Sequence, residues 1–224
     1  MVVDTHSAKA AAAPPSADER RARRRAARVA DNRADILDAA ERTFAERGLS
    51  DGSLRDIAKH SGFSTAAIYN YFENKQHLLA ETLSRRGTEL LEVITTAGGQ
   101  GTSPMARLHQ IIDGTVAFFE RYPDFRQLLR RVRETDAIVM EALTNYAGDR
   151  LELFTQTLAL MTGIVEDGQR TGEIREGNAN ALLHLYMTLV YEHVHLSATN
   201  PTTGTLTLDQ FHAFIDGALR QPHP

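Results

Sequence analysis

Residues 54–75 read LRDIAKHSGFSTAAIYNYFENK, and this stretch decides the fold. Two short segments with helical apolar spacing flank a tight turn, the pattern of a helix-turn-helix. Ala58 is small where two helices must cross closely, and Gly62 tolerates the positive φ that the turn requires. Ile68 follows ten residues after Ala58, on the buried side of the second helix. The pattern predicts a unit whose second helix enters the major groove of DNA with its amino-terminal end first.

The outward side of this second helix carries hydroxyl and amide groups that can reach base edges or phosphates. The first turn of the next helix carries a lysine, which can share one phosphate with the helix amino terminus. The residues that we expect to contact DNA are Ser53, Ser64, Thr65, Ala66, Tyr69, Asn70, Tyr71 and Lys75. The alternative is a pair of ordinary amphipathic helices with a tyrosine-rich packing seam.

An Arg-rich segment, RRARRRAAR at residues 20–28, precedes this unit. It adds Arg24 and Arg28 to the expected DNA contacts if it inserts into an adjacent minor groove as an arm. A solvated tail without a specific role is the alternative. In structure, we expect residues 20–28 to form either a solvated tail or a helical extension. The charge distribution favours DNA contact, because residues 1–86 carry a net charge of +3 whereas residues 87–224 carry −7.

Composition excludes several classes of protein. The 224-residue chain has no Cys, which rules out disulfide frameworks, Cys-based zinc sites and Cys nucleophiles. No apolar run approaches the roughly 20 residues of a membrane span, and none forms the core of a signal peptide. We therefore expect a soluble cytoplasmic protein with no membrane partner.

Helical periodicity without strand alternation runs through the chain, so an all-α fold of about nine helices is expected. Residues 1–19, rich in Ala, Ser and Pro, are expected to be disordered. Start and stop signals predict helices after Ser53, Asn74, Ser103 and Thr207. The expected helices cover about 31–47, 54–61, 65–72, 75–97, 104–122, a short segment after Pro123, 136–169, 178–198 and 208–219.

Residues 33–83 resemble the tetracycline-repressor (TetR) family of bacterial transcription regulators. The resemblance rests on ILDAAERTFAERG at residues 36–48 and on LRDIAKHSGFSTAAIYNYFENKQHLL at residues 54–79. It implies three helices for DNA and six or more for a ligand pocket and dimer contacts. On this basis residues 1–30 form a disordered Arg-rich arm, 31–80 the DNA-binding domain and 81–224 the effector-binding and dimerisation domain.

The resemblance also implies a small-molecule pocket and a four-helix dimer interface in the second domain. Aromatic and Met side chains favour a mainly apolar effector, although plain core packing is the alternative role for each of them. Candidate pocket residues are Phe118, Phe119, Phe125, Leu128, Tyr146, Phe154, Leu158, Met161, Tyr186, Met187 and Tyr191. Candidate interface residues on the last two helices are Leu182, Leu189, Phe211, Phe214 and Ala218.

These observations favour a homodimeric repressor that binds a palindromic operator in double-stranded DNA and is released by a small effector. An activator of the same architecture and an architectural DNA-binding protein without an effector are the alternatives. No catalytic Ser/His/Asp arrangement, phosphate loop or cofactor fingerprint is present, so neither an enzyme nor a cofactor is expected. His184, His193 and His195 are poorly spaced for ligands on one helix, so no metal site is expected.

Overall fold

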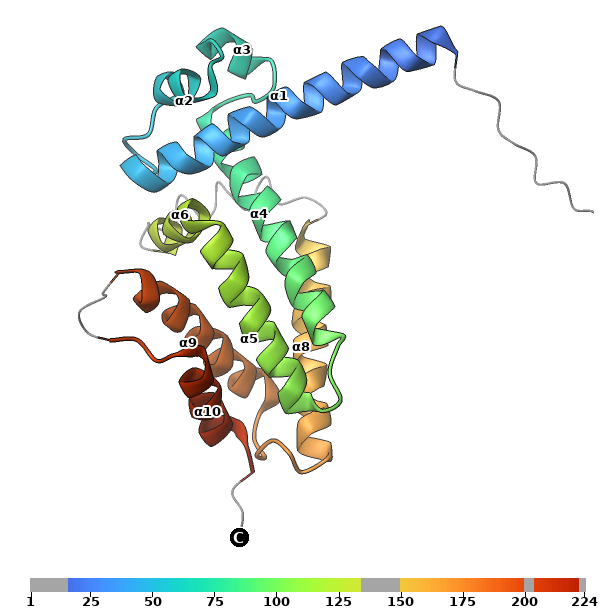
Figure 1. The fold of residues 1–224 in the computed structure, drawn as a ribbon, viewed down its shortest axis with the longest axis vertical. Coiled ribbons are helices and arrows are strands. Elements are labelled where there is room, and N and C mark those ends of the chain that lie inside the picture. Colours follow the sequence, from blue (N-terminus) through green and yellow to red (C-terminus); the bar gives the residue numbers. More distant parts are fainter. Residues whose placement is uncertain (1–15, 134–149, 200–203, 222–224) are drawn as a thin grey trace, which may run out of the picture.

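The computed structural model describes residues 16–133, 150–199 and 204–221. Within these ranges the chain forms nine helices and no strand beyond one antiparallel bridge between Ile174 and Arg220 (Figure 1). The prediction of an all-α fold is therefore confirmed. None of the described helices is long and apolar enough to cross a lipid bilayer.

The amino-terminal end of the fold consists of α1 (Ala17–Arg47), α2 (Leu54–Ser61) and α3 (Thr65–Tyr69), here called the helix-turn-helix unit. Its core is formed by apolar side chains from all three helices, from the start of the next helix and from residues 123–133. The fully buried members are Ile36, Ala40, Phe44, Ile57, Ile68, Leu78 and Leu128. Gly62 ends α2 with φ 74°, in the left-handed region expected from the sequence. A capping box between Ser53 and Asp56 begins α2, so the helix start predicted after Ser53 is confirmed.

α1 differs from the prediction because it begins at Ala17 rather than near residue 31. The assignment of residues 17–30 to a disordered arm is therefore wrong, and the alternative of a helical extension over residues 20–28 is confirmed. Residues 1–15 lie outside the described residues. Ser16 caps the helix: its Oγ accepts from the Glu19 backbone N–H, and its own N–H donates to Glu19 Oε2 at 2.7 Å. Ala and Arg are strong helix formers, so this segment is helical without burying an apolar face.

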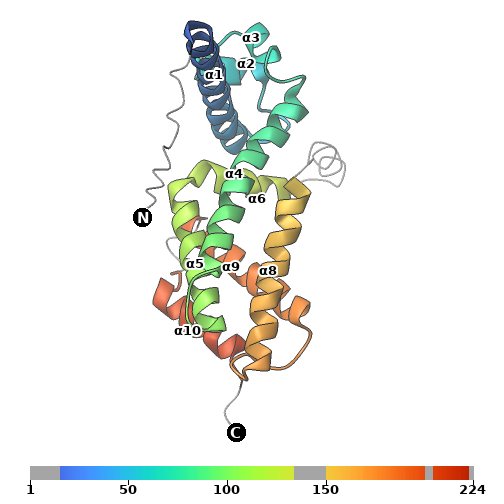
Figure 2. The same ribbon diagram turned by 90° about the vertical axis from the view of Figure 1, so that its right-hand side faces the viewer.

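The remaining helices form the helical body. They are α4 (Lys75–Gly98), α5 (Pro104–Arg121), α6 (Pro123–Arg133), α8 (Arg150–Arg170), α9 (Ala179–Thr199) and α10 (Leu208–Leu219). α4 runs from the helix-turn-helix unit into the body, and α6 lies across the junction between the two (Figures 1 and 2). The helix starts predicted after Asn74, Ser103 and Thr207 are confirmed.

α8 departs from the expected helix over residues 136–169. Its described part begins at Arg150 and ends at Arg170, and residues 134–149 lie outside the described residues. Met161 and Val165 are buried, but two of the candidate pocket residues are not: Phe154 is 47% exposed and Leu158 is 37% exposed. The apolar spacing correctly identified a helix, but it could not tell which of its turns would be covered by neighbours.

Candidate DNA-binding surface and effector cavity

α3 presents one polar face to solvent because its single fully buried side chain, Ile68, anchors the opposite face. Ser64 begins the helix, and its Oγ accepts a hydrogen bond from the Ala67 backbone N–H at 3.1 Å. Ala66, Tyr69 and Asn70 are exposed, and Thr65 is half-buried. The structure thus brings the residues expected on the recognition helix onto one accessible surface.

Tyr71 and Lys75 flank this surface and are held by contacts with the segments around it. The Tyr71 hydroxyl accepts a hydrogen bond from Asn32 Nδ2 at 3.1 Å, a contact that joins α1 to the end of the turn after α3. Lys75 Nζ donates to the Ser50 carbonyl at 2.9 Å, and burial lowers the pKa of Lys75. An ammonium has three donors, so this contact leaves donors for a phosphate.

Ser53 is engaged in the cap of α2. Its Oγ donates to Asp56 Oδ2 at 2.6 Å and accepts from the Asp56 backbone N–H at 3.2 Å. The hydrogen bond from Ser53 lowers the pKa of Asp56, and Arg47 at 3.0 Å from Asp56 Oδ1 acts in the same direction. The Ser53 side chain therefore stabilises the helix-turn-helix unit whether or not it also touches DNA. Arg24 and Arg28 are exposed on the amino-terminal half of α1.

An apolar cavity of about 260 Å³ lies in the helical body between α4, α5, α6, α8 and α9. The structure brings together five of the predicted pocket residues on its wall: Phe119, Met161, Tyr186, Met187 and Tyr191. The lining residues that the sequence did not identify as pocket candidates are Leu90, Ile94, Ile111, Thr115, Leu129, His184, Thr188 and Val190. Among the described residues, the lining includes no Asp, Glu, Lys or Arg. A charged ligand group would lose its hydration here without a partner, so this lining suits a neutral apolar group.

The other predicted pocket residues lie elsewhere. Phe125 is buried in a cluster with Phe118 and Phe119, and Phe118 faces a different hollow. Leu128 belongs to the core of the helix-turn-helix unit, and Phe154 and Leu158 are exposed on α8. Tyr146 lies outside the described residues.

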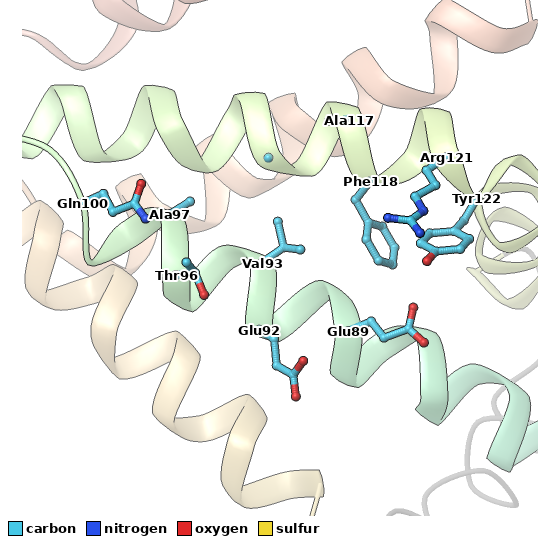
Figure 3. A pocket seen from close by; sticks show the side chains of 11 residues that line it. Glu89, Glu92, Val93, Thr96, Ala97, Gln100, Ala117, Phe118, Arg121 and Tyr122 are labelled. Carbon is cyan, nitrogen blue, oxygen red and sulfur yellow. The ribbon is translucent and has the colours of Figure 1, made fainter. Parts of the chain in front are cut away.

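That second hollow is an open groove of about 660 Å³ between α4 and α5 (Figure 3). Val93 and Phe118 supply apolar surface, whereas Glu89, Glu92 and Arg121 place charges along it. Both carboxylates and the guanidinium are visible in Figure 3 on the two flanking helices. The groove is larger than the apolar cavity, but its charged border fits the predicted apolar effector less well.

α6 connects the apolar cavity to the helix-turn-helix unit. Leu129 lines the cavity, whereas the adjacent Leu128 is fully buried in the core of the unit. Gln127 Nε2 and Arg131 Nε donate to the Ala45 carbonyl at 3.1 and 2.8 Å, and Arg131 also donates to the Glu46 carbonyl at 3.1 Å. These carbonyls belong to the last turn of α1, where a helix leaves acceptors without intrahelical partners.

A buried ion pair makes a second connection, between α1 and α4. Glu41 is 5% exposed and accepts a hydrogen bond from Arg86 Nε at 2.8 Å. Burial raises the pKa of Glu41, although Arg86 opposes this shift. The Arg86 guanidinium also lies 3.9 Å from the ring centroid of Tyr122, at the junction of α5 and α6. Arg86 therefore contacts both the helix-turn-helix unit and the helical body.

The predicted interface residues lie on α9 and α10 but are not equally accessible. Phe214 is 51% exposed, and Leu182, Leu189 and Ala218 are half-buried. Phe211 is 3% exposed and packs in the core of the helical body, so it can contribute to an interface only by packing against the side chains that form it. Two exposed leucines of α9, at 58% and 51%, were missed by the sequence reading: Leu185 and Leu196.

The three histidines considered for a metal contact different groups. His184 lines the apolar cavity, the His193 ring stacks on Phe211 at 4.1 Å, and the His195 ring stacks on Tyr191 at 3.8 Å. His195 Nδ1 also lies 2.8 Å from the Tyr191 carbonyl oxygen. In the described part of the chain, no group of three His, Asp or Glu side chains is arranged to hold a metal ion.

Comparison with known proteins agrees with this arrangement. The family model described as "Bacterial regulatory proteins, tetR family" matches residues 36–82. The chain is 29% identical to the HTH-type transcriptional repressor BepR of Brucella suis over 75% of this chain and 81% of the relative. It is 26% identical to the HTH-type transcriptional repressor KstR2 of Rhodococcus jostii, over 72% and 74%. The fold is similar to FadR from Bacillus subtilis in complex with stearoyl-CoA, with a TM-score of 0.70, 19% identity, and coverage of 85% and 99%.

Proposed function

We propose that this chain, which belongs to the tetR family of bacterial regulatory proteins, represses transcription as a homodimer. The homodimer binds a palindromic operator, and a small, mainly apolar effector releases it. The observation that carries this proposal is the exposed polar face of α3 on a helix-turn-helix unit that α4 and α6 join to an apolar cavity. The two relatives compared above are named transcriptional repressors, which favours repression over activation.

DNA recognition is assigned to α3 and its surroundings. Thr65, Ala66 and Asn70 are the candidates for base edges in the major groove, where Ala66 offers only a methyl contact, for example to thymine. Tyr69, with 54% exposure, and Lys75 are the candidates for phosphates, which set the register of the protein on the duplex. Ser53, Ser64 and Tyr71 lie at the edges of the same surface and complete the proposed contact set.

Dimerisation is assigned to α9 and α10. Leu182, Leu185, Leu189 and Leu196 follow the spacing of three, four and seven residues that places side chains on one side of a helix. Phe214 of α10 adds a large exposed ring. Exposed apolar surface of this kind marks an interaction site, and two-fold pairing of this face would present two copies of α3 to the two halves of a palindrome.

Effector release is assigned to the apolar cavity and to α6. A ligand that binds better to one position of α6 shifts the protein toward the state with that position. Gln127 and Arg131 of α6 donate hydrogen bonds to the Ala45 carbonyl in the last turn of α1. A shift of α6 therefore changes the position of the helix-turn-helix unit relative to the helical body. The similar fold of FadR was solved with stearoyl-CoA, and a hydrocarbon chain is the kind of group that this lining favours.

The test is selection of bound fragments from genomic DNA by the purified full chain at near-physiological salt, followed by sequencing. We expect one enriched palindrome, and we expect Tyr69→Ala to lower the recovery of all fragments about equally while the protein stays folded. Uniform recovery of all fragments would instead indicate a DNA-coating protein. Recovery of no DNA, both before and after refolding from denaturant to remove a bound effector, would overturn the proposal.

A further inference from the structure

We propose that the amino-terminal half of α1 is a rigid DNA-contacting extension, in which Arg21, Arg25 and Arg28 hold phosphates that flank the operator half-site. These three residues are called the arginine stripe below. The inference rests on the proposed DNA binding by α3. It deepens that function by adding a contact surface outside the helix-turn-helix unit, formed by a helix rather than by a flexible arm.

Helix continuity gives the extension its rigidity. α1 is one helix from Ala17 to Arg47, and its carboxy-terminal half is locked into the core of the unit by residues such as Ile36 and Phe44, both 0% exposed. Residues 16–31 are all exposed, so no part of this segment is used to build the core. The segment therefore projects in a direction that the helix-turn-helix unit sets.

Asn32 shows which side of the extension faces the DNA-binding surface. Its Nδ2 donates to the hydroxyl of Tyr71, which lies just after α3. Arg28, Arg25 and Arg21 precede Asn32 by four, seven and eleven residues, so they project within about 40° of its direction at 3.6 residues per turn. The other arginines, Arg20, Arg23 and Arg24, are turned away from that direction by roughly 80° to 180°.

The position of the extension fits DNA as its partner. In both views the amino-terminal end of α1 reaches the end of the molecule that carries α2 and α3 (Figures 1 and 2). The distance along the helix from Asn32 to Arg21 is about 17 Å, which corresponds to about five base pairs. Residues 17–31 hold six Arg against three acidic residues, so a polyanion is the complementary surface.

Phosphates rather than bases are the expected partners. A helix alongside the duplex presents guanidinium groups to the backbone, whereas an extended arm can enter a narrow minor groove. The arginine stripe should therefore add affinity and salt dependence without adding sequence preference. This assignment keeps Arg28 among the expected DNA contacts and replaces Arg24 by Arg21 and Arg25.

Two matched variants of the full chain test the proposal. One carries Arg21→Gln, Arg25→Gln and Arg28→Gln; the control carries Arg20→Gln, Arg23→Gln and Arg24→Gln. Both remove three positive charges and retain helix-forming side chains. Fluorescence anisotropy would measure binding to the selected operator with ten-base-pair flanks and to the same operator trimmed to the half-sites, over a range of salt concentrations. Circular dichroism would check that the helix content is unchanged.

We expect the stripe variant to lose at least about tenfold in affinity for the flanked operator and to become insensitive to trimming. The slope of log affinity against log salt concentration should become less steep by about three per protomer, because each lost phosphate contact contributes about 0.9 to that slope. The control should keep the flank dependence of the unchanged protein. Equal losses in both variants would indicate general charge attraction and overturn the stripe, as would an unchanged response to trimming. If the unchanged protein selects no operator, the proposed function itself has failed, which is a separate outcome.

Discussion

The helix-turn-helix unit and the helical body place their candidate functional residues in opposite environments. In the helix-turn-helix unit, the side chains proposed to contact DNA are exposed, and neighbouring core side chains fix the position of the helix. Tyr69 is 54% exposed, whereas the adjacent Ile68 is 0% exposed. In the body, the side chains around the apolar cavity are also part of the core, as Met161 and Tyr186 are. Function and stability are therefore separable at the DNA-binding end but shared at the cavity.

The largest expected effect comes from separating the two roles on α3. Ile68→Ala should lower the free energy of unfolding by about 3 kcal/mol, because it leaves a cavity in a small core. Tyr69→Ala should leave that free energy nearly unchanged and weaken DNA binding instead. Urea unfolding and anisotropy on operator DNA would measure both. Comparable destabilisation by the two substitutions would contradict the separation.

Filling the cavity should have the next largest effect. Thr115→Phe places a ring among the residues that line the apolar cavity, so we expect at least about tenfold weaker binding of the neutral apolar dye N-phenyl-1-naphthylamine, equivalent to about 1.4 kcal/mol. Ala117→Phe is the matched control, since Ala117 lies on the same helix but lines the α4–α5 groove (Figure 3). If Ala117→Phe blocks the dye and Thr115→Phe does not, the groove is the ligand site.

The same contrast explains what could be read from the sequence. The helix-turn-helix unit depends on short-range signals, and Ala58, Gly62 and the cap at Ser53 all appear where their chemistry predicts them. In the body, the role of a residue depends on which distant helix covers it. Leu128 and Leu129 are neighbours with the same hydropathy, yet one fills the core of the unit and the other lines the cavity.

The assignment of residues 17–30 to a disordered arm failed for a different reason. Apolar periodicity identifies helices that bury a face, and residues 17–31 bury none. A signal was nevertheless present, because Ser16 followed by Glu19 is the spacing of a capping box. Asn32 was also missed, since its bond to Tyr71 joins residues 39 positions apart.

A smaller effect is expected at the junction between the two regions. Arg131→Met removes the donors to the Ala45 and Glu46 carbonyls while keeping an apolar stem, so we expect about 1 kcal/mol of destabilisation and a weaker effect of bound dye on DNA affinity. Arg170→Met, at the far end of α8, removes the same charge and should change neither quantity. If bound dye changes the DNA affinity of Arg131→Met as much as that of the unchanged protein, α6 does not act through this contact.

The smallest expected effect is a difference between the two regions in how their stability falls with pH. Burial lowers the pKa of His195 in the body, so the stability that its neutral form provides is present above the ordinary value of 6.5 and is lost as pH falls through the lowered pKa. The hydrogen bond from Ser53 lowers the pKa of Asp56 in the helix-turn-helix unit, so its contribution is present above 3.8 and is lost only at lower pH. The urea concentration at the midpoint of unfolding, measured between pH 8 and pH 3, should therefore fall in two steps. The step at higher pH reports His195 in the helical body, and the step at lower pH reports Asp56 in the helix-turn-helix unit. His195→Gln should flatten the upper step and Asp56→Asn the lower one; the reverse assignment would show that the acid sensitivity of each region lies in other groups.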